Sequence, residues 1–475
     1  MGIHDLTKFI KTKFPHTIHY VYLSDFSNTR IAIDIMGWIH QTVMTANSTT
    51  VRRDTNILHS TQHDNHSKNI VIVLNSLRNY IKTFLDHKIT PVFVVDGKSP
   101  VLKQETQKSR NKQRDNRKQK SHELKQEIKK EYSKTKQLSK ERIDELKKIE
   151  KNNVDVKPYM EPIKQLITSL GIPYIQSLTE GEKTCSMMVE DGVCEAVISK
   201  DSDCIMLSPV VIRHFLRPDE VKALETPIQK YSNKTITELK EIPATLSPVC
   251  EVVIRDEILS KLEMTKESFT KFCILCGCDY NTNGSSSCIY RYGAATLYKE
   301  YKQLIDNLQK DILNKLNSGK HKKFETVIDV MFKDMRTKQN EQFEEFCEEN
   351  DLDFVDIMCS DTQEDAIKKI PSDVKKDFDK IFRCVVSYDK VRMKDCYDIL
   401  KYEEWYNTVD VYCDGTIEKV KLTEEEHKEI TQQLLDIGDV NDSMLRTLME
   451  KYNIRDFSFI SRFKKSKTVE KDVDM

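Results

Sequence analysis

The sequence predicts an α/β fold with a mostly parallel central sheet flanked by helices. Two short β-rich runs, "RIAIDIMG" (30–37) and "TPVFVVDG" (90–97), each reach an aspartate that is followed within three residues by a glycine. Between them, "IVIVLNSLRNYIKTFLDH" (70–87) carries apolar residues near helical spacing. A strand, a helix and a second strand in that order are typical of a parallel βαβ unit.

A third predicted strand, "AVISKDSD" (196–203), leads into two aspartates, Asp201 and Asp203. In an extended chain these two side chains point the same way, and their charges repel unless a cation lies between them. Asp34 and Asp96 follow the first two strands, and functional crevices of open α/β sheets lie at the carboxyl ends of the strands. The alternative, that each aspartate is a turn or helix-cap residue, weakens when three strand ends share the feature.

The composition changes between Lys103 and Lys148, where 17 Lys and Arg residues face 8 Asp and Glu residues without any proline or glycine. Such a segment is compatible with helix but too polar for a core helix. A solvated or disordered insert is one interpretation. The other is a basic flap over the acidic crevice, because a polyanion that enters a carboxylate cluster needs compensating positive charge. Lys103 and Arg110 lie two helical turns apart and would share a helix face.

Three further acids follow in the chain. Glu180 and Glu182 stand just before a predicted helix, where Thr179-x-x-Glu182 also fits a capping box that would merely start that helix. The segment 249–280 predicts a strand followed by helices. Asp279 comes at the end of the last of them (269–278), a position that the helix dipole disfavours for an acid.

An all-carboxylate site suits hard divalent cations, best Mg²⁺, with Mn²⁺ as a substitute. Seven acids are too many for one ion but fit two ions about 4 Å apart, of which one activates water and the other stabilises the leaving oxygen of a phosphodiester. The candidate metal ligands are Asp34, Asp96, Glu180, Glu182, Asp201, Asp203 and Asp279.

Bulk composition narrows the function classes. The 475 residues carry 75 Lys and Arg against 76 Asp and Glu, so any nucleic-acid surface must be a local patch. No apolar run approaches a membrane span and no signal-peptide core precedes the 13 cysteines, so we expect an intracellular protein that is not secreted, with reduced thiols. Cys273-x-x-Cys276 has no second pair at zinc-finger spacing, which disfavours zinc.

Six segments resemble the flap-endonuclease (XPG-type) family of structure-specific 5′ nucleases, which includes the 5′-to-3′ exonucleases of mismatch repair. They span roughly residues 1–300 in the family's order: "MGI", "AIDIMGWIH", "PVFVVDGKSPVLKQE", "GIPYIQSLTEGE", "VISKDSDC" and "CILCGCDY". The resemblance implies a PIN-like (Rossmann-like) fold. It also implies Mg²⁺-dependent hydrolysis of DNA in replication, repair or recombination, with all seven acids at positions that the family uses for two metal ions.

The same resemblance gives roles to basic and terminal residues. Lys103 and Arg110 match catalytic residues that touch the scissile phosphate at the base of a helical arch, and the basic insert matches the arch itself. Gly2 matches an N-terminal residue near the active site, and His40 matches a position that stacks on an unpaired base. The DNA-binding residues expected on this basis are Gly2, His40, Lys103, Lys108, Arg110, Arg114 and Arg291.

The sequence departs from the family pattern after "GCDY". The family has a glycine-rich helix-hairpin-helix loop there, whose backbone and a bound monovalent cation grip duplex phosphates. Here Cys288 and Tyr290 replace the paired glycines, which predicts a weaker or reshaped grip and leaves potassium dependence open. The C-terminal segment "IRDFSFISRFKK" lacks the glutamine-led sliding-clamp motif, so clamp binding is not supported.

These features predict four regions and one main activity. Residues 1–102 and 158–300 would form the nuclease domain, 103–157 the basic helical arch, and 301–475 a largely helical region of unknown role. The expected partners are DNA with 5′ flaps, ends, nicks or gaps, in the nucleus or at a cytoplasmic viral replication site; flap and exonuclease preference stay open. The alternatives are a catalytically inactive DNA-binding scaffold, another Mg²⁺ phosphotransferase or phosphatase, and a 5′-to-3′ exoribonuclease.

Overall fold

The chain forms two compact units, which we call the helical unit (Met1–Thr17 with Asp256–Lys401) and the sheet unit (Ile18–Arg255 with Tyr402–Met475). The predicted helix-hairpin-helix loop, with Arg291, and most of the predicted C-terminal region lie outside the described residues. Among the described helices, none is long and apolar enough to cross a membrane. The computed structural model describes residues 2–3, 5–53, 62–135, 139–224, 228, 247–280, 294–299, 301–302, 341, 344–350, 352, 397–404, 425, 435 and 438–454.

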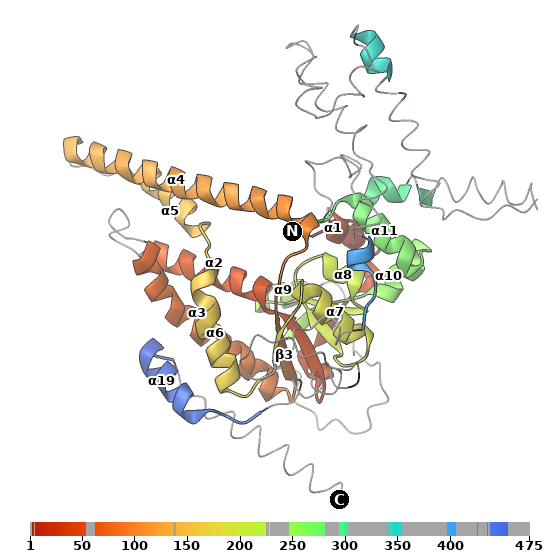
Figure 1. The fold of residues 1–475 in the computed structure, drawn as a ribbon, viewed down its shortest axis with the longest axis horizontal. Coiled ribbons are helices and arrows are strands. Elements are labelled where there is room, and N and C mark those ends of the chain that lie inside the picture. The colour runs from red at the N-terminus through yellow and green to blue at the C-terminus, as the bar shows by residue number, and fades with distance from the viewer. Residues whose placement is uncertain are drawn as a thin grey trace, which may run out of the picture. The chain divides into compact units, whose positions relative to one another are not determined.

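A seven-stranded sheet of described residues lies at the centre of the sheet unit, in the order β1-β7-β6-β5-β2-β3-β4 (Figure 1). Strands β2 to β6 pair in parallel, whereas β7 pairs antiparallel with both β1 and β6. The strands are β1 (Ile18–Tyr22), β2 (Arg30–Asp34), β3 (Thr90–Val95), β4 (Tyr174–Gln176), β5 (Ala196–Ile198), β6 (Val210–Phe215) and β7 (Val249–Ile254).

The strand order fixes which helices share a face of the sheet. From β2 to β3 and β4 the chain moves toward one edge, and from β4 to β5 and β6 it moves back, so right-handed crossovers place the two sets of helices on opposite faces. The packing agrees: α3 contacts α6, and α7 contacts α8. The described helices of this unit are α2 (Ile35–Arg53), α3 (Gln62–Asp86), α4 (Gln104–Thr135), α5 (Lys140–Lys151), α6 (Lys157–Ser169), α7 (Gly181–Glu190), α8 (Asp203–Leu207), α9 (Pro218–Lys222) and α19 (Asp442–Tyr452).

The direction change creates a topological switch point between β2 and β5. Strand β2 has β3 on one side and β5 on the other, both parallel to it. Crossovers from these strands run to opposite faces, so the loops at their carboxyl ends diverge and leave a crevice. The crevice lies where β2 ends in Asp34 and where the loop after β5 carries Asp201.

Burial explains why these segments form strands. All six residues of β3 are buried, and β2 is buried from Ile31 to Asp34, so both strands are covered on both faces. β-branched residues dominate both runs, as is typical of parallel strands in an α/β core. Helix α7 is almost as deeply buried, with Cys185, Met187 and Met188 inside the core.

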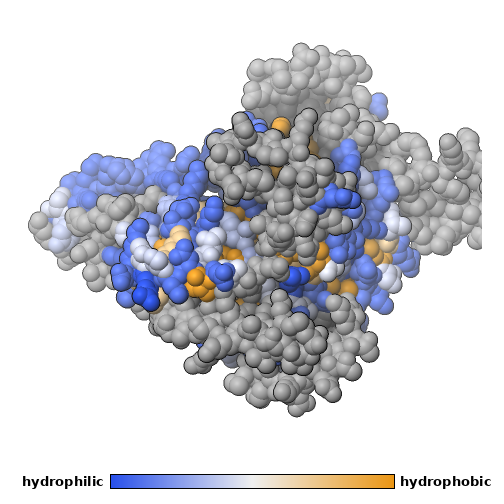
Figure 2. All heavy atoms as spheres, turned by 60° about the horizontal axis from the view of Figure 1, so that its bottom comes forward, coloured by the Kyte–Doolittle hydropathy of each residue, from blue (hydrophilic) through white to orange (hydrophobic). Residues whose placement is uncertain are grey.

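The basic insert forms two helices rather than a disordered segment. Helices α4 and α5 run side by side (Figure 1) and enclose a small core of Leu124, Ile128 and Leu146 against Val51 of α2. Glu150 of α5 accepts a hydrogen bond from the Ser121 hydroxyl of α4 (2.6 Å). On the left of the space-filling view, where Figure 1 places α4 and α5, the side chains are mostly hydrophilic (Figure 2).

The described part of the helical unit contains α1 (Leu6–Lys13), most of α10 (Arg255–Leu262) and α11 (Lys266–Cys276). Phe9 of α1 lies against two rings of this unit, Phe272 of α11 (centroids 6.5 Å apart) and Tyr298 (5.4 Å). The Tyr301 hydroxyl donates to the carbonyl of Glu263, the residue that follows α10 (3.2 Å). These contacts pack α1 against elements more than 250 residues later in the chain.

A tight backbone crossing fixes the loop after β3. The Gly97 N–H donates to the Thr179 carbonyl (2.6 Å), and the Lys98 N–H donates to the Leu178 carbonyl (3.0 Å). A Cβ at Gly97 would lie 2.0 Å from the Ser177 carbonyl oxygen, well inside van der Waals contact. Only glycine fits at this position, so the residue after Asp96 holds the β3 and β4 loops together.

The predicted fold class is confirmed. The predicted strands and the helix between the first two appear as β2, β3, β5 and α3, and the segment 249–280 forms β7, α10 and α11. One detail is wrong. Helix α11 ends at Cys276, so Asp279 does not directly follow a helix. The predicted arch, 103–157, contains α4, α5 and the first residue of α6.

Replacement of Gly97 by alanine should destabilise the protein by about 3 kcal/mol, because the added methyl overlaps backbone that cannot move away cheaply. Gly192→Ala is the matched control, because a Cβ there meets open space. The only cost is the backbone strain of a side chain at a φ of +70°, which should be about 1 kcal/mol. Urea denaturation of both variants measures the difference. Equal midpoints would show that the crossing is not tight.

Candidate metal site

Asp34 forms the floor of the site at the end of β2. Its carboxylate accepts a hydrogen bond from the Met36 N–H (3.0 Å), at the start of α2. A Cβ at Gly37 would lie 3.2 Å from Asp34 Oδ2, so the first turn of α2 closes over the carboxylate. The side chain is buried and 5% exposed.

Asp96 follows β3 and is tied to the start of α7. Its Oδ1 accepts a hydrogen bond from the Gly181 N–H (2.7 Å), one of the donors that a helix leaves free at its N-terminus. A Cβ at Gly181 would lie 3.0 Å from the same oxygen. The glycine between Glu180 and Glu182 therefore lets a carboxylate from another strand approach the helix.

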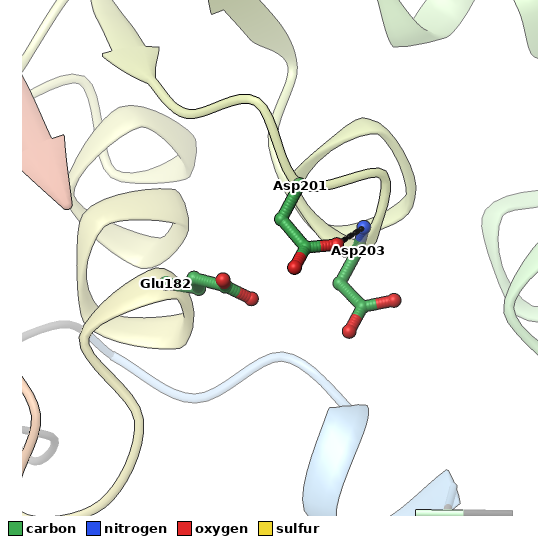
Figure 3. A group of neighbouring side chains, drawn as sticks. All are labelled: Glu182, Asp201 and Asp203. Carbon is green, nitrogen blue, oxygen red and sulfur yellow. Dashed lines mark hydrogen bonds between the residues drawn. The ribbon is translucent and has the colours of Figure 1, made fainter. Parts of the chain in front are cut away.

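Glu182, Asp201 and Asp203 form the one group of three close metal-ligand side chains among the described residues. One carboxylate oxygen from each lies within 4.8 Å of the others. Figure 3 shows Glu182 on α7 facing the two aspartates of the segment that leads into α8. The arrangement offers three oxygen ligands to one cation.

The two aspartates meet by a turn and not, as predicted, in an extended chain. Ser202 has helical backbone angles (φ −76°, ψ −15°), and Asp203 begins α8. The Asp203 N–H approaches Asp201 Oδ1 (3.4 Å), as in a helix start. The prediction of a common direction from strand geometry is wrong, because the strand ends at Ile198 and the chain turns before Asp203.

Glu180 differs from the other acids because a lysine neutralises it. Glu180 is the N-cap residue of α7, and its carboxylate forms a buried ion pair with Lys103. The capping box of Thr179 and Glu182 is wrong, since the helix begins one residue later and no side chain caps it. Glu180 therefore has a basic partner, whereas Glu182 faces other acids.

The pKa values of Asp34 and Glu182 reflect burial and the repulsion between neighbouring carboxylates. Burial raises the pKa of Asp34 to about 7, and the charge of Asp96 and then that of Asp201 add to the rise. The pKa of Glu182 lies well above its ordinary range, first because of burial and next because of Asp201. Lys103 acts in the opposite direction on Glu182. These shifts place Asp34, Asp96, Glu182 and Asp201 within electrostatic reach of one another.

The chemistry of the donor set fits divalent cations such as Mg²⁺. The ligands are carboxylates alone, which hard cations prefer. Burial and then the charges of neighbouring acids raise the pKa values of Asp34 and Glu182, and a bound cation would act in the opposite direction. Cys273 and Cys276 are buried within α11.

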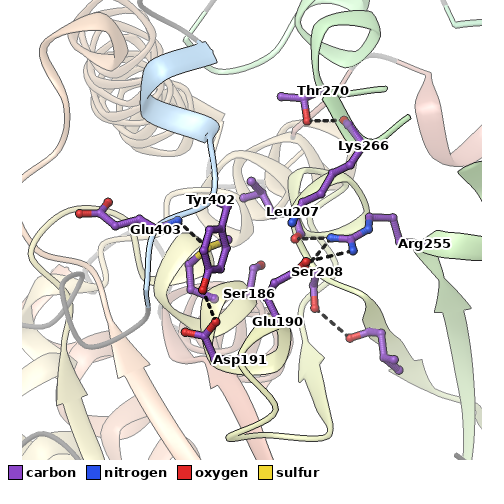
Figure 4. A network of polar contacts seen from close by, with 12 residues as sticks. Ser186, Glu190, Asp191, Leu207, Ser208, Arg255, Lys266, Thr270, Tyr402 and Glu403 are labelled. Atoms are coloured by element: carbon purple, nitrogen blue, oxygen red, sulfur yellow. Dashed lines mark hydrogen bonds and ion pairs between the residues drawn. The ribbon is translucent and has the colours of Figure 1, made fainter. Parts of the chain in front are cut away.

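The end of α7 away from the acids is anchored by polar contacts (Figure 4). Arg255, which is 5% exposed, donates to the Glu190 carboxylate (2.8 Å) and to the Leu207 carbonyl (3.0 Å). The Tyr402 hydroxyl donates to Asp191 Oδ1 (2.6 Å). Arg255, which follows β7, and Tyr402, more than 200 positions after α7, therefore hold the helix that carries Glu182.

A second tie lies near the middle of α7. Glu403 forms an ion pair with Lys183 (2.9 Å), and the Lys183 side chain is only 11% exposed. Burial of this pair makes its geometry matter, because a lone buried charge would be costly. Tyr402 and Glu403 thus contact the site helix from outside the segments that resemble the nuclease family.

The basic residues of the predicted arch start at the site and continue along α4. Lys103 ends a short 3₁₀ turn (Val101–Lys103), and α4 begins at the next residue. The pKa of His40 on α2 is lowered, first because the ring is partly removed from water and next because of the charge of Arg110. Lys108 is exposed, and Arg114 donates to Asn111 on the same helix (3.2 Å).

Three predicted residues are not described with the sheet unit. Asp279 lies in the helical unit and is buried (6% exposed), and Gly2 lies in the same unit with a φ of 79°. Arg291 lies outside the described residues. The structure therefore brings together the six predicted acids of the sheet unit with Lys103, and it describes Asp279 with its own unit only.

Sequence reasoning missed the groups that orient Asp201. The Asp201 N–H donates to Ser199 Oγ (3.1 Å), and Arg213 donates to the Asp201 carbonyl (3.0 Å). Arg213 is a charged residue inside the buried run "VVIRHF" of β6, and this isolated charge was the signal that could have identified it.

Comparison with known proteins gives two family matches and several relatives. The XPG N-terminal domain matches residues 1–117, and the XPG I-region matches residues 171–279. Flap endonuclease 1 of Anoplopoma fimbria is 27% identical over 324 residues, which cover 68% of this chain and 70% of the relative. Flap endonuclease 1 of Theileria parva is 28% identical over 282 residues, 59% of this chain and 47% of the relative.

Solved structures with similar chains are more distant. The catalytic core of Rad2 in complex with DNA substrate (complex III) covers 95% of both chains at 17% identity with a TM-score of 0.49. Flap endonuclease-1 from Methanococcus jannaschii covers 78% of this chain and 98% of its own, at 19% identity with a TM-score of 0.36.

Asp34→Asn should stabilise the protein in EDTA above pH 7. The folded-state pKa of about 7 exceeds the unfolded value of about 3.9, so the folded state loses stability as pH rises between these values. Asparagine removes this loss, which we expect to be worth about 2 kcal/mol at pH 8. Thermal melts from pH 5 to 8 measure it.

The control for this experiment is Asp86→Asn, an acid that is half exposed at the end of α3 and pairs with Lys82. It should leave the pH dependence of the melting temperature unchanged. Mg²⁺ should raise the melting temperature of the wild type more than that of Asp34→Asn, which keeps the group of Glu182, Asp201 and Asp203. A loss of stability in Asp34→Asn at pH 8 in EDTA would contradict the repulsion described here.

Proposed function

This chain belongs to the XPG-type family of structure-specific nucleases, and we propose that it hydrolyses phosphodiester bonds of DNA at 5′ flaps or 5′ ends with the help of divalent metal ions. The observation that carries the proposal is the group of buried and half-buried carboxylates at the switch point of the sheet. Glu182, Asp201 and Asp203 lie within ligand distance of a common point, and Asp34 and Asp96 add charge beside them.

Two subsites follow from the geometry. Glu182, Asp201 and Asp203 would hold one ion, because one oxygen of each lies within 4.8 Å of the others. Asp34 and Asp96 would hold a second ion, because the charge of Asp96 acts on the buried Asp34 carboxylate and a cation beside both would offset it. When bound, Mg²⁺ or Mn²⁺ supplies Lewis-acid chemistry that activates water and stabilises a leaving oxygen.

The protein's own side chains set the electrostatics of the reacting phosphate. Lys103 borders the acids through its ion pair with Glu180, and it is the innermost cation of the basic insert. An incoming phosphate would compete with Glu180 for this ammonium group. A cation that moves from a carboxylate toward developing phosphate charge favours the transition state over the ground state.

Helix α4 supports a polyanionic substrate. Its first half carries Lys108, Arg110, Arg114 and Arg117, and Arg110 acts electrostatically on His40 of α2. These charges lie on the helix that begins directly after Lys103, so a DNA strand that reaches the acids would pass along this helix. Such contacts act on phosphates and carry no sequence preference.

Asp201→Ala should lower cleavage about 1,000-fold while DNA binding stays measurable, because it removes a ligand oxygen but leaves the basic residues in place. The assay is a panel of labelled flap, nicked, gapped, hairpin and blunt-ended DNA, with a matching RNA strand, in Mg²⁺ and in EDTA. We expect cleavage of 5′-flapped or 5′-ended DNA in Mg²⁺ and no cleavage in EDTA.

Asp219→Ala, an exposed acid on α9, serves as the control and should cut like the wild type. Wild-type turnover of Asp201→Ala would remove the proposed mechanism. Preferential cutting of the RNA strand would replace DNA by RNA as the substrate.

Lys103→Ala should lower kcat about 100-fold and change the affinity for DNA less than threefold, since one cation among many contributes little to binding but acts at the reacting phosphate. Single-turnover cleavage and filter binding measure the two effects. Lys112→Ala, an exposed lysine on α4, is the matched control. Equal losses in cleavage and binding would assign Lys103 to phosphate docking alone.

A further inference from the structure

A cleft of about 500 Å³ opens beside Asp34 in the sheet unit. Helices α2 and α3 form one side, and the ends of β2, β5 and β6 form the other. This volume lies in the range of small-ligand sites. The carboxylate group Glu182, Asp201 and Asp203 does not line the cleft, so the cleft is a separate cavity that shares only Asp34 with the proposed metal ligands.

The apolar wall of the cleft is aromatic. Trp38 of α2 stacks on Tyr80 of α3, with ring centroids 5.4 Å apart and planes 20° apart. Phe215, at the end of β6, lies 6.1 Å from the Tyr80 ring. All three rings are partly exposed, so their faces and edges remain accessible to a flat apolar group.

Positive charge also lines the cleft. Lys200 and Arg213 are lining residues, the first just before Asp201 and the second on β6. The hydrogen bond from Arg213 to the Asp201 carbonyl (3.0 Å) holds the guanidinium in place. The acids that act on these cations, Glu220 on Lys200 and Glu251 and Asp201 on Arg213, do not line the cleft.

Polar neutral groups also line the cleft. They include Gln41 and Thr42 of α2 and Asn79 of α3. Amide side chains both donate and accept hydrogen bonds, and a nucleobase edge presents both kinds of group. Aromatic rings, neutral polar groups and two cations in one cavity match the base, sugar and phosphate of a nucleotide.

We propose that this cleft binds one nucleoside 5′-monophosphate unit, with its base against Trp38 and Tyr80 and its phosphate beside Lys200 and Arg213. The proposal rests on the proposed function for its substrate class, and it adds a subsite apart from the carboxylates. The unit could be a free mononucleotide or the terminal nucleotide of a 5′-phosphorylated strand, because both present the same base and phosphate.

Trp38 provides a direct probe, since the chain contains only two tryptophans. In a full-length Trp405→Phe variant, Trp38 is the sole tryptophan, and a base that approaches its ring should quench its fluorescence. Titrations in EDTA prevent cleavage. We expect saturable quenching by thymidine 5′-monophosphate or by a 5′-phosphorylated oligothymidylate, and none by inorganic phosphate alone.

Lys200→Gln in the same background should weaken binding of the phosphorylated probe about tenfold and leave the weak binding of thymidine unchanged, because it removes one charge-assisted contact to phosphate. Lys222→Gln, an exposed lysine on α9 that does not line the cleft, is the matched control and should change neither affinity. Circular dichroism verifies that each variant is folded.

The outcomes distinguish the two ligands, and they separate the subsite from the proposed function. Quenching by the mononucleotide supports a free-product site, and quenching by the oligonucleotide alone supports a site for the strand end. Absence of quenching by both probes in a folded protein overturns the subsite, as does an equal loss of affinity in Lys200→Gln and Lys222→Gln. Because the readout needs no turnover, a protein that cuts DNA without quenching refutes only the subsite.

Discussion

One constraint shapes the site: the sheet brings several carboxylates together at one edge, where their charges repel one another. Parallel strands end on the same side, so Asp34 and Asp96, which end or follow adjacent strands, are neighbours by topology. Burial then removes the water that would otherwise screen them, and the pKa of Asp34 rises to about 7. Such a group opposes folding unless a cation is present, and proteins keep such groups where function requires them.

The surrounding backbone holds the acids against that repulsion. Gly97 and Gly181 lie on either side of Asp96, and both positions lack room for a side chain. The Gly181 N–H gives Asp96 a partner at the positive end of α7. Arg255 and Tyr402 fix the other end of the same helix. The site is therefore rigid because its tethers come from several separate strands and loops rather than from one.

The sequence predicted the parts of the site that follow from local pattern. Strand runs that end in aspartate indicated the sheet and its acidic edge, because strand direction alone brings these ends together. Where geometry depends on an exact chain turn, the prediction was wrong: Asp201 and Asp203 meet through the helical turn at Ser202, and α7 begins after Glu180. A shift of one or two residues in an element boundary changes which way a side chain points.

Features assembled from distant segments could not be predicted in the same way. The ion pair of Lys103 with Glu180 joins residues 77 positions apart, and the ties of Tyr402 and Glu403 to α7 cross more than 200 positions. No local periodicity encodes such contacts. The basic insert was a partial exception: its charge indicated a solvated helix, but the few apolar residues that pack α4 on α5 were too sparse to predict the pairing.

The cleft beside Asp34 changes how the site would hold a substrate. A metal-bound phosphate needs positioning from more than its own charge, because carboxylates alone offer no contact to a base or sugar. The sequence resemblance predicts a weaker duplex grip, because Cys288 and Tyr290 replace two family glycines. Trp38 and Tyr80 supply a stacking surface within the sheet unit, and Asp34 joins this surface to the acids. A grip on one nucleotide next to the reacting phosphate would make positioning depend less on contacts to the duplex.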